Sequence, residues 1–372
     1  MVEDKRYSKL EIAVICAEED IQKRSYPERK KQEKKKYYTY RKRERYPRDE
    51  SHYNQGQEEE FLIFLEYLKP SVDCVLDNHL PLNTTLEEYW RIHDGLICLH
   101  LQRYFGKSLR RSMGIIHYFA RREFPDMKVP CFKTLNNYQN DSTFSFYFDK
   151  VIEITSQPLK ALETRFTTDG TGEGTSCRTP WYSIKAGKEV KKREHMIATV
   201  TSTVILNSVI AVDVSDHEDP KTAINHIDTT STNGFSIEHW SGDSLYLMRA
   251  LCNKISEKGG QAHLRIKSNT IVNSKGSQEW KRMVTLMKQK DENEIDELNL
   301  RQNAESTNSA KKRKFGGNTR SKNDTSRIND IKNGWSCYNF SVLARAYHER
   351  NIKPAFLHYQ PTRTFNPSTP YT

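Results

Sequence analysis

The chain has 372 residues and a mass of 43.6 kDa, enough for two or three domains at roughly 100–200 residues each. Charged residues make up 29%, hydrophobic residues only 35%, and the mean hydropathy is −0.83, so part of the chain is expected to be tail or linker. No run approaches the roughly 18 apolar residues of a membrane helix, and the first residues lack the apolar stretch of a signal peptide, which argues against membrane spanning and Sec secretion.

Seven cysteines are scattered singly along the sequence, and no CxxC motif occurs. This spacing excludes zinc-ribbon and thioredoxin-like motifs and favours reduced thiols in a cytoplasmic protein.

The net charge is 59 − 48 = +11. A basic balance of this size suggests a polyanionic partner such as nucleic acid.

Two segments hold the excess positive charge. Residues 21–50 contain 13 Lys and Arg against 5 Asp and Glu, and residues 301–322 contain 7 against 1. Two concentrated basic segments in a near-neutral remainder are what a nucleic-acid enzyme needs. A solvated tail and a solvated helix face explain each segment equally well.

Both ends of the chain are predicted to lie outside a core. The run KRSYPERKKQEKKKYYTYRKRERYPRDESHYNQGQEEE is nearly free of aliphatic side chains, so residues 1–57 are predicted as a basic, poorly ordered arm. Its tyrosines suit stacking on bases and suit a solvated tail equally. Residues 350–372 contain four prolines and are predicted as a terminal tail.

Residues 58–162 have apolar side chains at helical spacing and predict a small all-helical domain. Within it, SLRRSMGIIHYFARREF and FKTLNNYQND are two short helices joined by PDMKVPC, and this pairing resembles a helix-turn-helix. In that interpretation the second helix binds DNA through Lys133, Asn136 and Asn137, with Thr134 and Tyr138 beside them. A helix that only packs in a bundle is the alternative.

From residue 163 onward the spacing changes to that of strands and predicts an α/β domain over residues 163–349. We expect one helix over residues 296–317 and one or two further helices in residues 319–349. The five strand-like runs are ETRFTTDG, HMIATVTST, NSVIAVDVS, FSIEHWSGD and QAHLRIKSN, with helices after the third and the fourth.

Three acidic residues occupy positions where such a sheet brings distant segments together. Asp169 ends the first strand, Asp243 ends the fourth, and Glu305 lies in the helix over residues 296–317. Three carboxylates with room for phosphate and water suit Mg²⁺, and two such ions can promote phosphodiester transfer. An acid that only caps a turn is the alternative for each position.

The sequence around these acids resembles the catalytic core of prokaryotic insertion-sequence transposases of the DDE type. The resemblance extends over roughly residues 83–348 and implies a ribonuclease H-like fold, a mixed sheet flanked by helices, with Asp169, Asp243 and Glu305 as the metal-binding catalytic triad. The segments that carry it are FTTDGTGEGTSCRTPWYSIKAGKEVKKREHMIATV, GDSLYLMRALCNKISEKGGQAHLRIKSN and RQNAESTNSAKKRKFGGNTRSK, together with SQPLKALETRF and VPCFKTLNNYQND upstream.

The family's signature around the glutamate also contains a Tyr, an Arg and a Lys. Arg301 and Lys312 match the Arg and the Lys, and both are expected on the face of the Glu305 helix, where they hold DNA phosphates. The neighbouring Lys311 and Arg313 are expected to bind DNA as well. Leu298 stands where the family has its Tyr, which removes one expected hydrogen bond to the DNA backbone.

The resemblance implies an enzyme that uses two Mg²⁺ or Mn²⁺ ions. It would bind the terminal inverted repeats of its element, cleave a strand to free a 3′-OH and join that hydroxyl to target DNA. A homodimer on double-stranded DNA in the nucleoid is expected. Two alternatives remain open: a decayed or co-opted sequence-specific DNA-binding protein, and a structure-selective ribonuclease H-like nuclease.

Two further patterns have ordinary explanations. The glycines at 170, 172 and 174 lack the spacing of a phosphate-binding loop and predict a turn between two strands. His217, His226 and His239 fit no zinc-ligand spacing and are predicted as surface histidines.

Overall fold

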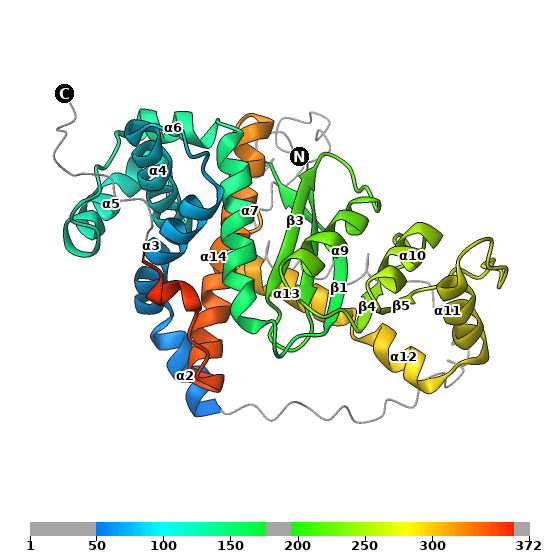
Figure 1. The fold of residues 1–372 in the computed structure, drawn as a ribbon. Coiled ribbons are helices and arrows are strands. Elements are labelled where there is room, and N and C mark those ends of the chain that lie inside the picture. Colours follow the sequence, from blue (N-terminus) through cyan, green and yellow to red (C-terminus); the bar gives the residue numbers. More distant parts are fainter. Residues whose placement is uncertain (1–49, 176–194, 361–372) are drawn as a thin grey trace, which may run out of the picture. The chain divides into compact units, whose positions relative to one another are not determined.

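The computed structural model describes residues 50–175 and 195–360 (Figure 1). The chain divides into two units, Met1–Arg48 and Asp49–Thr372, and the elements below belong to the second. Residues 1–49, 176–194 and 361–372 lie outside the described residues, and they include most of the predicted basic arm and the end of the predicted tail.

A helix occupies the last part of the stretch predicted as a poorly ordered arm. Helix α2 spans Glu50–Glu58 and packs against the long helix α14 (Asp324–Arg350). Its Gly56 approaches the other backbone closely, because a Cβ there would lie 3.2 Å from the Cα of Arg345. Packing against a neighbouring helix therefore stabilises a segment that has almost no aliphatic side chains of its own.

The helical region begins with α3 and ends shortly before the sheet. Its second helix is capped by Thr85, whose side chain accepts a hydrogen bond from the Glu88 N–H (3.2 Å). The elements of this region are α3 Glu60–His79, α4 Leu86–Tyr104, α5 Leu109–Glu123, α6 Phe132–Gln139, α7 Thr143–Ser156 and the 3₁₀ turn η1 Gln157–Leu159.

The five predicted strands form one mixed sheet in the order β3-β2-β1-β4-β5. The first three strands pair antiparallel, whereas β4 and β5 run parallel to β1. Their bounds are β1 Arg165–Gly174, β2 His195–Thr203, β3 Val209–Ser215, β4 His239–Gly242 and β5 Gln261–Leu264. The chain is thus an α/β protein with a five-stranded mixed sheet flanked by helices (Figure 1).

The helix predicted over residues 296–317 is two helices, which corrects the prediction. The break lies at Leu300 and Arg301, whose N–H groups bond three residues back, to Glu297 and Leu298. Helix α11 follows β5 and was not predicted, and residues 324–350 form the single helix α14. The elements are α9 Thr222–Thr232, α10 Arg249–Glu257, α11 Gln278–Gln289, α12 Glu292–Asn299, α13 Gln302–Phe315, α14 and the 3₁₀ turn η2 Ala355–His358.

Two apolar cores cover the two faces of the sheet. One contains Ala198 and Val200 of β2 together with α3, α4, α7 and α14. The other contains Trp240 of β4 together with α9, α10 and α11. The first core runs from the helical region into the sheet, so the predicted boundary between residues 162 and 163 does not separate two cores.

Among the described residues, none of the helices combines the length and the apolar character needed to cross a membrane.

Candidate functional site

The two aspartates named from the sequence emerge side by side from neighbouring strands. Thr168 of β1 pairs with Gly242 of β4 in parallel register, and Asp169 and Asp243 are the next residues on each strand. Because side chains alternate along a strand, Asp169, Thr171 and Glu173 point to the same face of the sheet. That face is covered by α13.

Helix α13 brings the third acid to this end of the sheet. Asn308 of α13 donates a hydrogen bond to Asp169 (Nδ2 to Oδ2, 3.0 Å), and Lys312 donates one to the Gly172 carbonyl (2.8 Å). Asp169, Glu305 and Lys312 line one open pocket of about 460 Å³, which also includes Arg313. The structure therefore places residues that are more than 130 positions apart in the sequence at one site.

A fourth carboxylate, Glu218, reaches the same end of the sheet from the opposite face. It lies in the connection between β3 and α9 and accepts a hydrogen bond from the Tyr246 hydroxyl (Oη to Oε1, 3.2 Å). It lies directly over Gly170, where an added Cβ would clash with its Oε1. In the sequence, Glu218 lies in an acidic run that does not mark it as a site residue. Its only indirect signal is Gly170 beside Asp169, because the close approach of Glu218 leaves no room for a Cβ there.

Burial and nearby carboxylates raise the proton affinity of Asp169 and Glu218. The pKa of Asp169 is raised from 3.8 to about 6, first by burial and then by the charges of Asp243, Glu305 and Glu218. The pKa of Glu218 is also raised, by burial and by Asp243, although the hydrogen bond from Tyr246 opposes the shift. The raised pKa values show that the cationic side chains nearby do not fully neutralise the negative charge of these carboxylates.

The donor set suits a hard divalent cation, but the described side chains do not converge on one. In residues 50–175 and 195–360, no group of three or more His, Cys, Asp or Glu side chains is arranged to hold a metal ion. Asp243 accepts a hydrogen bond from the Leu245 N–H (2.7 Å), as a turn residue does, and Glu305 faces Arg301. Asp243 and Glu305 would have to rotate to share an ion with Asp169.

The basic residues of the predicted signature have different roles in the structure. Arg301 is the residue directly before α13, and its guanidinium pairs with Glu305 four residues later (3.0 Å), so the two lie on the same face as predicted. Leu298 belongs to the separate helix α12 and is half-buried. Lys312 and Arg313 line the pocket beside Asp169, which is the position their predicted role requires.

Lys311 does not fit the prediction that it binds DNA. Its side chain is fully buried, and its Nζ lies 2.6 Å from Oε1 of Glu173, which is also fully buried. Burial lowers the pKa of Lys311 to about 8, although Glu173 opposes this shift. The pair joins α13 to β1 four residues beyond Asp169, so Lys311 holds the helix on the sheet and is not available to DNA.

The predicted DNA-reading helix is α6, and its three named residues are exposed: Lys133, Asn136 and Asn137. They line a shallow hollow with Leu109 and Phe132. The connection from α5 to α6 covers residues 124–131, longer than the turn of about three or four residues in a helix-turn-helix. The geometry thus leaves these side chains accessible but departs from that motif.

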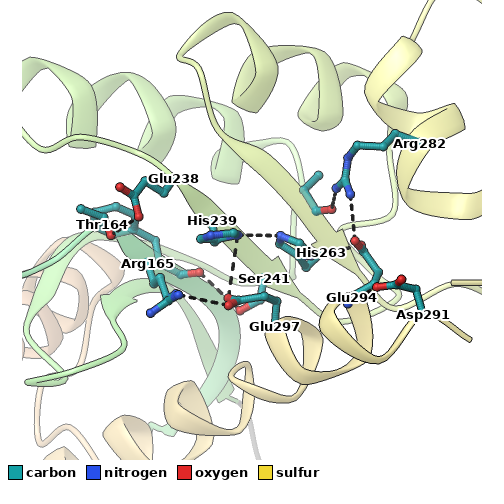
Figure 2. A network of polar contacts seen from close by, with 12 residues as sticks. Thr164, Arg165, Glu238, His239, Ser241, His263, Arg282, Asp291, Glu294 and Glu297 are labelled. Carbon is teal, nitrogen blue, oxygen red and sulfur yellow. Dashed lines mark hydrogen bonds and ion pairs between the residues drawn. The ribbon is translucent and has the colours of Figure 1, made fainter. Parts of the chain in front are cut away.

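A buried polar network attaches α12 to the edge of the sheet that carries β4 and β5 (Figure 2). His263 of β5 lies between His239 of β4 (Nε2 to Nδ1, 2.9 Å) and Glu294 of α12 (Nδ1 to Oε1, 3.1 Å). Arg282 of α11 pairs with Glu294 (2.9 Å), and Glu297 pairs with Arg165 of β1 (3.3 Å). Because α13 follows α12 directly, this network sets where the Glu305 helix begins.

Two lesser predictions are corrected. The glycines at 170, 172 and 174 are not a turn but the last part of β1, paired with β2. His217 is exposed as predicted, whereas His226 is buried between Thr201 (Nδ1 to Oγ1, 2.9 Å) and Asp213 (Nε2 to Oδ2, 3.1 Å).

Comparison of the chain with protein-family models, with curated proteins and with solved structures finds no match.

Proposed function

We propose that the chain is a DDE transposase with a ribonuclease H-like catalytic domain. The strand order β3-β2-β1-β4-β5, with three antiparallel strands followed by two parallel ones, supports that fold. The parallel pairing of β1 with β4 supports the pairing of Asp169 with Asp243 in one site. Helix α13 supplies Glu305 to the same pocket as Asp169.

The observation that carries the proposal is the gathering of Asp169, Asp243, Glu305 and Glu218 at one end of the sheet, where they and burial raise the pKa of Asp169 to about 6. A carboxylate that serves only as a turn cap has no need of three acidic neighbours. Clusters of this kind mark functional sites more often than structural ones, because the repulsion destabilises the fold unless a ligand relieves it. The ligand expected here is cationic.

Asp169, Asp243 and Glu305 are the residues that would hold Mg²⁺ or Mn²⁺. When bound, two such ions activate water and stabilise the leaving oxygen in phosphodiester transfer. Asn308 orients the Asp169 carboxylate through its 3.0 Å hydrogen bond, and Arg301 positions Glu305 at the pocket through a hydrogen bond of 3.0 Å. Lys312 and Arg313 bind the phosphates that flank the scissile bond.

The reaction has two displacements at phosphorus. In the first, a water oxygen attacks at the end of the element and the 3′ oxygen leaves as a free hydroxyl. In the second, that 3′-OH attacks a phosphodiester of target DNA and displaces another 3′ oxygen. Two ends must be joined in one event, so a homodimer on double-stranded DNA is expected.

The test uses the full chain, Mg²⁺ or Mn²⁺, and duplexes that contain the DNA flanking its own coding region. We expect a nick at the boundary of an inverted repeat, abolished by Asp169→Asn, Asp243→Asn or Glu305→Gln while binding of the duplex persists. Asp296→Asn, which removes an exposed carboxylate of α12 outside the pocket, is the matched control and retains cleavage. Wild-type cleavage by any of the three triad variants removes that residue from the site.

A DNA-binding protein without cleavage activity is the second candidate. It is favoured by Leu298 at the position of the family's Tyr and by the partners that already engage Asp243 and Glu305. The same assay separates the two, because this candidate predicts binding to the repeats with no nick in either metal. A nuclease of the same fold predicts cutting that is independent of end sequence.

A further inference from the structure

A hollow larger than the acidic pocket lies away from the carboxylates, where helices α4, α5 and α6 meet the segment after α13. This α5–α6 groove has a volume of about 1030 Å³. One wall is the turn from α4 into α5, another is α6 with Asn136, and the third is the segment 316–323. Hydrogen bonds from Gln139 to Ser321 (3.2 Å) and from Asn323 to Asn140 (2.6 Å) connect α6 with that segment.

The lining of the groove is strongly basic. The one acidic residue in it, Asp330, is already paired with the buried Arg103 (3.1 Å). Lys314 is engaged by Glu60 and by Gln57 (3.1 Å) of the neighbouring helices. Five exposed cations remain, and no carboxylate of the described residues forms an ion pair with them: Lys107, Arg110, Arg111, Arg320 and Lys322.

These cations come from two segments far apart in the sequence. Lys107, Arg110 and Arg111 lie where α5 begins, whereas Arg320 and Lys322 follow α13. Like charges repel one another, and the one acid of the groove is already paired with Arg103. Gathering five cations there therefore lowers the stability of the fold, and an anionic ligand would relieve that repulsion. Arg110 also lies over the Phe132 ring (4.6 Å), which keeps its guanidinium at the groove.

The groove and the acidic pocket are built on one helix and one strand. Glu305 and Lys312 of α13 line the pocket, and Lys314 and Phe315 of the same helix line the groove. The segment after α13 then pairs with the end of β1, through Gly174 N–H to the Gly317 carbonyl (2.9 Å) and Thr319 N–H to the Gly174 carbonyl (2.8 Å). An extended ligand that leaves the pocket along α13 therefore meets the groove next.

We propose that the α5–α6 groove binds the phosphate backbone of the DNA that adjoins the scissile bond. This inference rests on the proposed function and adds a second contact surface to it. A DNA strand presents one phosphate about every 3.4 Å, so several of the five cations engage at once. The amides that line the groove, among them Asn136, Gln139 and Asn318, add hydrogen bonds to phosphate or to base edges.

The test compares salt dependence of binding between two variants of equal charge. The groove variant carries Lys107→Ala, Arg111→Ala, Arg320→Ala and Lys322→Ala. The control variant carries Arg265→Ala, Lys267→Ala, Lys281→Ala and Lys288→Ala, four exposed cations around β5 and α11 that lie outside the groove. Both are titrated with a fluorescent duplex of random sequence, in EDTA so that no strand is cut.

Each lost phosphate contact lowers the slope of log Kd against log salt concentration by about 0.9. For the groove variant we expect the slope to be smaller than that of the wild-type protein by about 3 to 4. The slope of the control variant should differ from the wild-type slope by no more than about 0.9, the value of one contact. The two double variants, Lys107→Ala with Arg111→Ala and Arg320→Ala with Lys322→Ala, each lose about half as much slope as the groove variant. Circular dichroism melting of each variant shows whether it is folded.

Equal slopes for wild-type protein and the folded groove variant overturn the inference while leaving the proposed function intact, because cleavage is scored separately. If the slope of the control variant falls as much as that of the groove variant, the inference is overturned too, because the loss of any four surface cations would then explain the result. If the wild-type protein binds no duplex at any salt concentration, the proposed function fails and the groove assignment fails with it.

Discussion

Asp169 is ionised at neutral pH only at the expense of stability, because burial and three nearby carboxylates favour its protonated form. The folded protein binds this proton more tightly than the unfolded chain does. The free energy of unfolding therefore falls as the pH rises from about 4 to about 6 and stays lower above that range. A rise of the pKa from 3.8 to about 6 corresponds to at most about 3 kcal/mol, reduced by solvent at the open pocket.

We predict that Asp169→Asn is more stable than the wild-type protein at neutral pH in EDTA and loses this advantage near pH 4. Mg²⁺ then raises the melting temperature of the wild-type protein and leaves that of the variant nearly unchanged. Thermal melts across pH, with and without Mg²⁺, measure both effects. A variant that is less stable at neutral pH would show that the carboxylate serves the fold.

Glu218 provides a second prediction at this scale. Its charge raises the pKa of Asp169, so Glu218→Gln lowers that pKa toward 3.8. Titration of the Asp169 carboxyl carbon by NMR measures the shift directly. Glu257→Gln, at an exposed position on α10, is the control and leaves the pKa unchanged. An unchanged pKa in Glu218→Gln would place Glu218 outside the site.

The buried pair of Lys311 and Glu173 gives a third prediction. Lys311→Met leaves Glu173 buried without its partner, which costs about 3–5 kcal/mol. The double variant with Glu173→Gln recovers most of that loss, because no uncompensated charge remains. Urea unfolding of the single and double variants measures the coupling. Equal stability of the two variants would mean that the pair is not formed.

The acids of the proposed site could be predicted from the sequence, but the side chains that contact them could not. Asp243 directly follows β4, as predicted, whereas Asp169 lies inside β1, which continues to Gly174. The two still lie side by side because Thr168 pairs with Gly242 in parallel register. Glu218 and Asn308 could not be predicted, because only the three-dimensional approach of a loop and a helix gives them their position. Lys311 was misassigned because a Lys in a basic run looks exposed, and its partner Glu173 lies more than 130 residues earlier.

At the scale of elements, α12 determines where the Glu305 helix begins. We predict that Glu294→Ala loosens α12, because His263 and Arg282 lose a buried carboxylate between them. The melting temperature falls, and cleavage falls further than binding of DNA. Asp296→Ala, an exposed change on the same helix, is the control and alters neither. Unchanged melting of the Glu294 variant would contradict an anchoring role for the network in Figure 2.

Strands were easier to predict than the ends of helices. All five strand-like runs form strands, because β-branched and aromatic residues alternate in them. The break between α12 and α13 has no Pro or Gly to mark it; it arises because α12 packs on β4 and β5 whereas α13 packs on β1. Tertiary packing thus overrides the continuous helical pattern of residues 296–317.

At the scale of the whole molecule, the helical region and the sheet share one core through α14. The Asn339 side chain bonds to the Val209 N–H (2.8 Å) and carbonyl (2.7 Å) of β3 and to the Ile152 carbonyl (3.2 Å) of α7. Ser336 bonds to His100 of α4 (2.8 Å). These buried contacts cross the boundary that the sequence predicts between two domains.

We therefore predict that a fragment of residues 50–162 does not fold alone, whereas the full chain unfolds in one cooperative transition. Circular dichroism and amide exchange of the fragment would show fluctuating helices, because the surface normally covered by α14 is exposed. A sharp melting transition of the isolated fragment would establish the helical region as an independent domain.

The position of α14 at the far end of the sequence also has a consequence during synthesis. Helices α3 and α4 leave the ribosome early, but their partner begins 324 − 104 = 220 residues after α4 ends. At roughly 5–20 residues per second, this interval lasts roughly 10 to 45 seconds. During that time the apolar surface that α14 covers in the native protein has no partner, and chaperones that bind such surfaces have their longest opportunity to act.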